Sequence, residues 1–229
     1  MQKIFSFSIV QQILDRYGSF YLEGLMVTLQ LSAIAVFFGS IFGTLLAMMR
    51  RSRFAPLRLL AVAYTELIRN TPLLLQLYLF FFLLPRAIPL PIFEDRFPCI
   101  ALALCCNSAA YISEVIRSGI QAVDKGQSEA ARTLGLNQRQ TMTKIVLPQA
   151  IRNILPALCN EFVTIIKETS LGAVLFVGGL MSQANIVSGI TTRRMETLFI
   201  AGVYYFVINF TLSKLVAYME RRMQGGKQQ

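Results

Sequence analysis

The sequence predicts an all-α integral membrane protein, a bundle of about five transmembrane helices. Its 229 residues are 55% hydrophobic and only 15% charged, and the mean hydropathy is +0.55. Soluble domains carry about a quarter charged residues, so this chain has more apolar surface than a water-soluble core can hide. Several apolar stretches are also about 20 residues or longer, the length at which a helix crosses the hydrocarbon core of a bilayer.

Five stretches qualify as membrane spans. Each is expected to be helical, because a helix satisfies its own backbone hydrogen bonds in lipid. The run from Tyr78 to Leu84 is apolar at every residue, unlike the alternating strands of a membrane β-barrel. The predicted spans are, in order, Leu25–Met49, Leu57–Leu84, Pro98–Ile116, Ile154–Leu180 and Thr197–Met219.

Glycine and proline give some of these spans individual features. Gly39 and Gly43 in the first span have the small-xxx-small spacing that lets two helices approach closely, either within the chain or between copies. Pro72 is expected to kink the second span. Prolines between Pro85 and Pro98 predict a short irregular connection rather than a folded domain. We therefore expect one transmembrane domain over residues 1–229.

The basic residues indicate how the spans are oriented. Lys and Arg are more frequent after the first, third and fifth spans than in the segments on the other side. Segments rich in these residues stay in the cytoplasm. The amino terminus is therefore expected outside and the carboxyl terminus inside, which requires an odd number of spans.

Composition also disfavours several function classes. The net charge of +10 could indicate nucleic acid, but the charges lie between apolar spans rather than on a soluble basic face, so we expect no nucleic acid. The chain has no histidine, the commonest metal ligand and general base. Cys99, Cys105, Cys106 and Cys159 lack metal-ligand spacing, and we interpret them as small hydrophobes. There is no Gly-rich phosphate loop. An enzyme is therefore not expected.

The longest connection expected in the cytoplasm runs from Arg117 to Asn153. At about residues 121–148 it contains two predicted short helices, and from Asp124 to Pro148 it reads DKGQSEAARTLGLNQRQTMTKIVLP. Pro148 is expected to end the second helix from beyond. A compact pair of helices should therefore protrude from the membrane. On local chemistry alone, a solvated connector would account for it equally well.

Local signals set the other ends of these two helices. Gln127 or Ser128 can open the first helix, and Gly135 can close it by adopting a left-handed conformation. Asn137 followed by Gln140 has the spacing of a capping box at the start of the second helix. The two helices should therefore meet at a tight turn.

Seven residues of this connection share a distinctive spacing: Glu129, Ala130, Ala131, Gly135, Ile145, Leu147 and Pro148. In that spacing they resemble the EAA loop of binding-protein-dependent ABC importer permeases. The resemblance implies a type I ABC importer-like fold, in which this loop is the coupling helix that docks on an ATPase subunit. It assigns docking to Glu129, Ala130, Ala131 and Gly135. The alanines would let the helix seat in a groove of the partner, the glutamate favours the helix start, and the glycine permits a sharp exit.

The resemblance extends over nearly the whole chain. Three further stretches are similar to the polar amino acid branch of these permeases: Glu66, Arg69, Asn70, Thr71, Pro72 and Gln76; Ala110, Tyr111, Glu114, Arg117 and Gly119; and Asn160, Glu161, Lys167, Thr169, Ser170 and Leu171. Several stretches in the right order are more specific than one motif. Cys105 and Cys106 depart from the family pattern.

Polar groups at membrane depth are costly and therefore indicate function. A zwitterionic amino acid needs donors for its carboxylate and acceptors for its ammonium group, and a mixed set converging on one level would suit it. Alternatively the groups pair with one another, as Glu66 and Arg69 could at helical spacing. The candidates for the substrate pathway are Arg69, Asn70, Gln76, Asn107, Glu114, Lys167 and Glu168.

The resemblance also implies partners. These are two ABC ATPase subunits, a second copy or homologue of the permease, an extracytoplasmic amino-acid-binding protein and membrane lipid, in a bacterial inner membrane. ATP and magnesium would be bound by the ATPase, with no cofactor in this chain.

An ion-gradient-driven secondary transporter and a membrane scaffold are the alternatives. An acidic proton relay across several spans would favour the secondary transporter. The carboxylates of this chain, however, lie mostly toward the expected cytoplasmic ends. A scaffold needs neither the matched loop nor polar groups at mid-depth. The importer interpretation explains both features.

Overall fold

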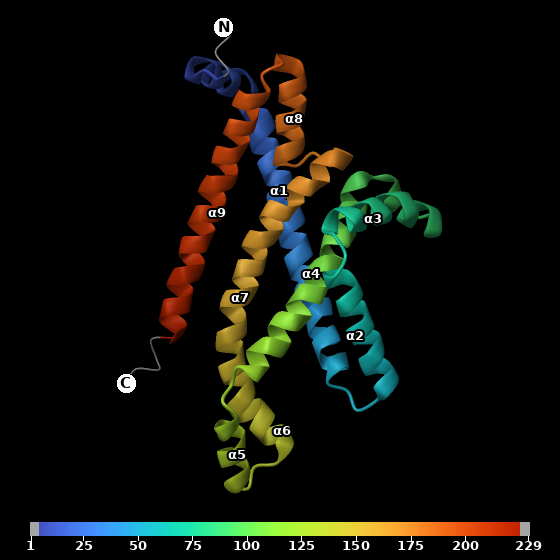
Figure 1. The fold of residues 1–229 in the computed structure, drawn as a ribbon, viewed down its shortest axis with the longest axis vertical. Helices are drawn as coiled ribbons and strands as arrows, with labels where there is room; N and C mark the ends of the chain where they lie inside the picture. The colour runs from blue at the N-terminus through green and yellow to red at the C-terminus, as the bar shows by residue number, and fades with distance from the viewer. Residues whose placement is uncertain (1–4, 225–229) are drawn as a thin grey trace.

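The computed structural model describes residues 5–224, and residues 1–4 and 225–229 of the predicted domain lie outside them. The described chain consists of helices joined by short turns and contains no strand. Three helices are individually long and apolar enough to cross a membrane: α1 (Phe7–Arg50), α4 (Arg96–Gln121) and α9 (Arg194–Gln224). They lie along the length of an elongated molecule (Figure 1). The predicted all-α class is therefore confirmed.

Two further predicted spans are bent pairs of helices. In the first pair, α2 (Ala55–Arg69) and α3 (Leu73–Ala87) meet at 107°. In the second, the helical run that contains α7 (Leu147–Glu168) and the 3₁₀ turn η3 (Thr169–Leu175) meets α8 (Leu180–Thr191) at 44°. By length and composition the described chain therefore has three spans, or up to five if each bent pair counts as one.

The second predicted span, Leu57–Leu84, is interrupted near Pro72, where a kink was expected, and the interruption is a complete break in the helix. The helix stops at Asn70, and Pro72 starts the next one from an extended conformation, because proline has no N–H to continue the ladder. Side chains donate hydrogen bonds to the backbone carbonyl groups that the break leaves without an N–H partner. The Asn70 side chain donates to the Glu66 carbonyl at 2.8 Å, and the Thr71 hydroxyl to the Leu67 carbonyl at 2.9 Å. The sharp bend is thus compatible with an apolar environment.

Small residues build the central contact between α1 and α4. A Cβ atom at Gly39 would lie 2.8 Å from the Ser108 side chain, and one at Gly43 would lie 2.9 Å from the Ala109 carbonyl oxygen. The two glycines therefore serve packing within the chain. Beside this contact a hydrophobic cluster joins α1, α3, α4 and α7, and its buried members include Leu31, Leu77, Leu104 and Ile165.

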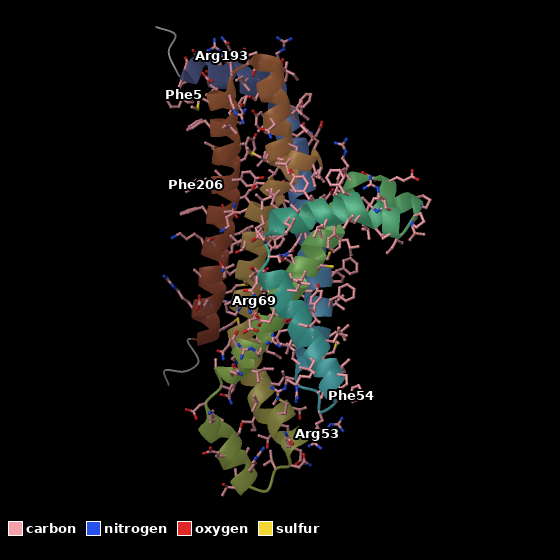
Figure 2. All side chains as sticks on the ribbon, turned by 45° about the vertical axis from the view of Figure 1, so that its right-hand side comes forward. Phe5, Arg53, Phe54, Arg69, Arg193 and Phe206 are labelled. Atoms are coloured by element: carbon pink, nitrogen blue, oxygen red, sulfur yellow. The ribbon has the colours of Figure 1, made fainter. Side chains whose placement is uncertain are left out.

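Large apolar side chains remain exposed along α1, α2, α3 and α9. Phe206 on α9 is 67% exposed and points away from the bundle in Figure 2. Phe37, Leu59 and Leu83 are similarly exposed. Contiguous apolar surface on this scale is expected where lipid or another membrane chain covers it.

The shortest elements lie in the connections. The 3₁₀ turn η1 (Pro91–Glu94) joins α3 to α4. At the other end of α4, α5 (Lys125–Thr133), α6 (Gln138–Gln140) and the π-helical turn η2 (Thr141–Val146) precede α7. Figure 1 shows α5 and α6 projecting beyond the ends of the long helices.

Replacing Gly43 with Ala should lower the free energy of unfolding of the purified chain by about 1–3 kcal/mol, because the new methyl group meets the α4 backbone, which cannot move aside. The matched control is Gly18→Ala in the same helix, where nothing lies within 4 Å of the new methyl group. That variant should be neutral or slightly more stable. Thermal unfolding in detergent compares the two, and equal stability of both variants would contradict the tight α1–α4 contact.

Candidate functional site

Defined caps bound the two helices that project from the bundle, α5 and α6, which together are called the projecting unit. The Asp124 carboxylate accepts a hydrogen bond from the Gly126 N–H at 2.6 Å and opens α5. The predicted start at Gln127 or Ser128 was therefore wrong, because an aspartate upstream caps the helix instead. Gly135 has φ of +83°, as predicted for the turn. Its N–H bonds to the Arg132 carbonyl and the next N–H to the Ala131 carbonyl, which together form a Schellman cap.

The second helix of the unit starts as predicted but does not end as predicted. Asn137 Oδ1 accepts from the Gln140 N–H at 2.9 Å, and Gln140 Oε1 from the Asn137 N–H at 3.0 Å, so the capping box is confirmed. Pro148, however, lies in the first turn of α7, and the helix runs on through it. The π turn makes this possible: the Leu147 N–H bonds to the Met142 carbonyl, five residues back, just before the proline removes a donor.

One face of α5 is exposed, and the other packs against η2. Ala131 is 4% exposed, on the side where α5 contacts η2. Glu129 and Ala130 are exposed, as is Gly135 at the turn. The two alanines of the motif therefore have different environments: one fixes α5 to its own chain, and the other is free to meet a partner.

One carboxylate ties three arginines together where α1, α2 and α4 meet. Glu114 on α4 lies 2.8 Å from Nη1 of Arg50 and 3.7 Å from Nη1 of Arg69, and it also accepts from Arg117. The Arg69 guanidinium stacks 5.6 Å from the centre of the Tyr111 ring. Glu66 hydrogen-bonds the Asn70 amide at 3.0 Å, so the alternative pairing of Glu66 with Arg69 is not found among residues 5–224. The cluster binds three helices together with excess positive charge.

Gln76 and Asn107 form a buried pair between α3 and α4. The Asn107 amide donates to Gln76 Oε1 at 3.0 Å, and the two residues are 3% and 4% exposed respectively. The Gln76 amide in turn donates to the Ile68 carbonyl at 2.8 Å and to Thr71. The pair therefore supports the break between α2 and α3. Asn107 Oδ1 is buried and has no hydrogen-bond partner among the described residues.

Lys167 and Glu168 are the last two residues of α7, and Lys167 borders a cavity of about 270 Å³ that lies between α7, α8 and α9. Lys167 lines this cavity and is exposed, whereas Glu168 Oε2 is buried without a hydrogen-bond partner. Ser170 and Tyr205 also line it. Sequence reasoning missed Tyr205, because nothing distinguishes this tyrosine from the other aromatic residues of an apolar helix.

Six of the seven candidate pathway residues form three groups, and the seventh, Asn70, bonds Glu66 instead. Arg69 belongs to the Glu114 cluster, Gln76 pairs with Asn107, and Lys167 adjoins Glu168. Within the described residues no hydrogen bond or ion pair joins one group to another. A single level containing all of them is therefore not evident in one copy of the chain. The described part of the chain contains no group of three or more His, Cys, Asp or Glu residues that could hold a metal ion.

The fold and its projecting unit define a multi-pass helical membrane protein with a helical hairpin outside the spans. The chain belongs to the family of binding-protein-dependent transport system inner membrane components, whose model matches residues 36–225. It is thus a permease subunit of an ABC importer in the inner membrane, as the EAA loop indicated. Such subunits are non-catalytic and work with ATPase and binding-protein partners.

Curated relatives match over most of their length. The chain is 40% identical to the arginine transport system permease protein ArtQ of Bacillus subtilis, covering 90% of this chain and 93% of that protein. It is 42% identical to the putative glutamine transport system permease protein GlnP of Rickettsia felis, covering 89% and 93%. Its fold matches the crystal structure of an amino acid ABC transporter with histidines, with a TM-score of 0.86 and 42% identity over 91% of this chain and 96% of that one.

Glu114→Ala should lower the stability of the chain by about 2 kcal/mol or more, because it leaves the guanidinium groups of Arg50 and Arg117 facing one another without a carboxylate. Glu66→Ala is the control, since Glu66 is exposed and its carboxylate bonds Asn70 alone within residues 5–224. This substitution should cost less than about 1 kcal/mol. Thermal unfolding in detergent at low salt measures both. If the two substitutions cost the same, the Glu114 cluster does not hold the helices together.

Proposed function

We propose that this chain is the permease of an importer for polar amino acids, coupled to its ATPase through α5. The observation that carries the proposal is the projecting hairpin, which exposes Glu129 and Ala130 beyond the spans. Two relatives named for arginine and glutamine transport support an amino acid as the solute. An extracytoplasmic binding protein would deliver that solute.

Docking on the ATPase is assigned to the exposed side of α5. Ala130 offers a small side chain at which a partner can approach the helix closely, and Glu129 adds a carboxylate beside it. Ala131 acts indirectly by seating α5 on η2, and Gly135 by closing the turn. The partner ATPase would hold ATP and magnesium and perform the hydrolysis.

A direct mechanical route leads from α5 to the membrane interior. α5 packs on η2, which continues into α7 without a break. Gln149 at the start of α7 also donates to Gln127 of α5 at 3.4 Å. At its far end the same helix carries Lys167 and Glu168. A displacement of α5 by the ATPase would therefore be passed along α7, with the bundle as the two-state element that nucleotide biases.

The pathway would lie between two permease copies or close homologues. In one copy Lys167, Arg69 and Asn70 are exposed, and a polar surface at membrane depth requires a second chain to cover it. Lys167 could bind the solute carboxylate, and the unpartnered carboxylate oxygen of Glu168 could accept from its ammonium group. Gln76 and Asn107 would position the break between α2 and α3 rather than contact the solute. Glu114 would hold Arg50, Arg69 and Arg117 in place beside the pathway.

Ala130→Arg should abolish copurification of the ATPase with the permease, because a long charged side chain would prevent close docking of α5. The matched control is Ala55→Arg, which adds the same side chain at an exposed position at the start of α2. Mild detergent extraction from the native membrane, followed by mass spectrometry, identifies the copurifying subunits. Unchanged copurification with Ala130→Arg would remove α5 as the docking element, and absence of an ATPase from the unaltered sample would favour a self-contained transporter.

Lys167→Gln should reduce uptake of labelled arginine or glutamine, whichever the unaltered transporter carries, by about tenfold or more, since a charge-assisted contact is lost. Lys167→Arg should restore part of the uptake by keeping the cation. Lys214→Gln on α9 is the control for loss of an exposed lysine. Uptake into proteoliposomes gives the comparison, and full activity of Lys167→Gln would exclude Lys167 from the pathway.

A further inference from the structure

A cavity of about 630 Å³ lies apart from the three groups of pathway candidates, where the projecting unit meets the ends of two spans, and shares Glu129 with the proposed docking surface. Arg51 contributes from the turn after α1, and Gln121 from the last residue of α4. Lys125 and Arg132 contribute from α5, and Val146 from η2. Because α1 and α4 end here, the cavity is placed at the boundary between the hydrocarbon and water.

The cavity carries unneutralised positive charge. Arg51, Lys125 and Arg132 line it, against the single carboxylate of Glu129. The ion pairs of Glu114 do not include Arg51, Lys125 or Arg132, and within the described chain these three cations have no carboxylate at ion-pair distance. The chain thus pairs the deeper arginines of the Glu114 cluster but leaves these cations open to an external anion.

The remaining walls are mixed in a way that suits one class of ligand. Ser128 and Gln121 add polar groups beside the cations. Val123 and Val146 are buried members of a hydrophobic cluster and form an apolar side. A phosphate group with a short apolar stem would match cations on one side and aliphatic carbon on the other. Anionic phospholipids present such a group at this depth, and basic pockets beside membrane helices bind their headgroups.

We propose that this cavity binds the phosphate headgroup of an anionic phospholipid through Arg51, Lys125 and Arg132. The bound lipid would bridge the fixed ends of α1 and α4 to α5, and so hold the projecting helix in one position against the bundle. The site is independent of the proposed amino acid pathway, because it uses none of its residues.

The test uses the full chain purified in neutral detergent. Native mass spectrometry measures binding of phosphatidylglycerol and, as the zwitterionic comparison, phosphatidylcholine. The site variant combines Arg51→Gln, Lys125→Gln and Arg132→Gln. The control variant combines Arg53→Gln, Arg58→Gln and Lys144→Gln, which removes the same charge from exposed residues outside the cavity. Glycerol 3-phosphate without a lipid tail forms a third arm.

The unaltered chain and the control variant should retain phosphatidylglycerol in preference to phosphatidylcholine, and the site variant should bind phosphatidylglycerol at least about tenfold more weakly. Equal loss in both variants would show a diffuse effect of surface charge and overturn the site. Unchanged binding by the site variant would overturn it too. If glycerol 3-phosphate displaces phosphatidylglycerol only at a far higher concentration, the ligand is the lipid. If glycerol 3-phosphate binds and phosphatidylglycerol shows no preference over phosphatidylcholine, the lipid is overturned as the source of the phosphate.

Discussion

A continuous helical run from Gln138 to Glu168 connects the part of the molecule outside the spans to the part within them. The run survives a proline in the first turn of α7, because the π turn shifts the backbone hydrogen bonds at the point where Pro148 lacks a donor. Were the helix to end there, α5 would be joined to the bundle only through the short turn after α4 and its packing contacts. The assignment of α5 as the coupling element depends on this continuity, since a displacement at one end reaches Lys167 only through an unbroken helix.

The hydrocarbon environment explains how the other irregular segments are stabilised. Where Pro72 interrupts the helix between α2 and α3, the side chains of Asn70, Thr71 and Gln76 bond the carbonyl groups left free. Where arginines gather at depth, the Glu114 carboxylate bonds them. Unsatisfied backbone and unpaired charge cost several kcal/mol in lipid, so at these two places polar side chains offset a cost that regular helix would not incur.

Sequence reasoning reached the helical class, the Asn137 capping box and the left-handed Gly135, because each depends on composition or on residues a few positions apart. It placed a kink at Pro72 without its angle, because the angle depends on which side chains donate hydrogen bonds to the freed carbonyl groups. It missed the partners of Glu114, since Arg50 lies 64 residues away in the chain. It also treated Ala130 and Ala131 as equivalent, because only the packing of α5 on η2 separates an outward from an inward alanine.

Continuity of α7 is the central claim, and a pair of matched variants tests it in the reconstituted importer. Ile151 and Leu155 are exposed on α7, between the projecting unit and Lys167. Replacing both with Gly weakens the helix by about 1 kcal/mol per residue relative to replacing both with Ala, which removes nearly the same side-chain surface. Measuring ATP hydrolysis and amino acid uptake together should show hydrolysis without proportionate uptake in the Gly pair and normal coupling in the Ala pair. The same ratio of uptake to hydrolysis in both would contradict transmission through this helix.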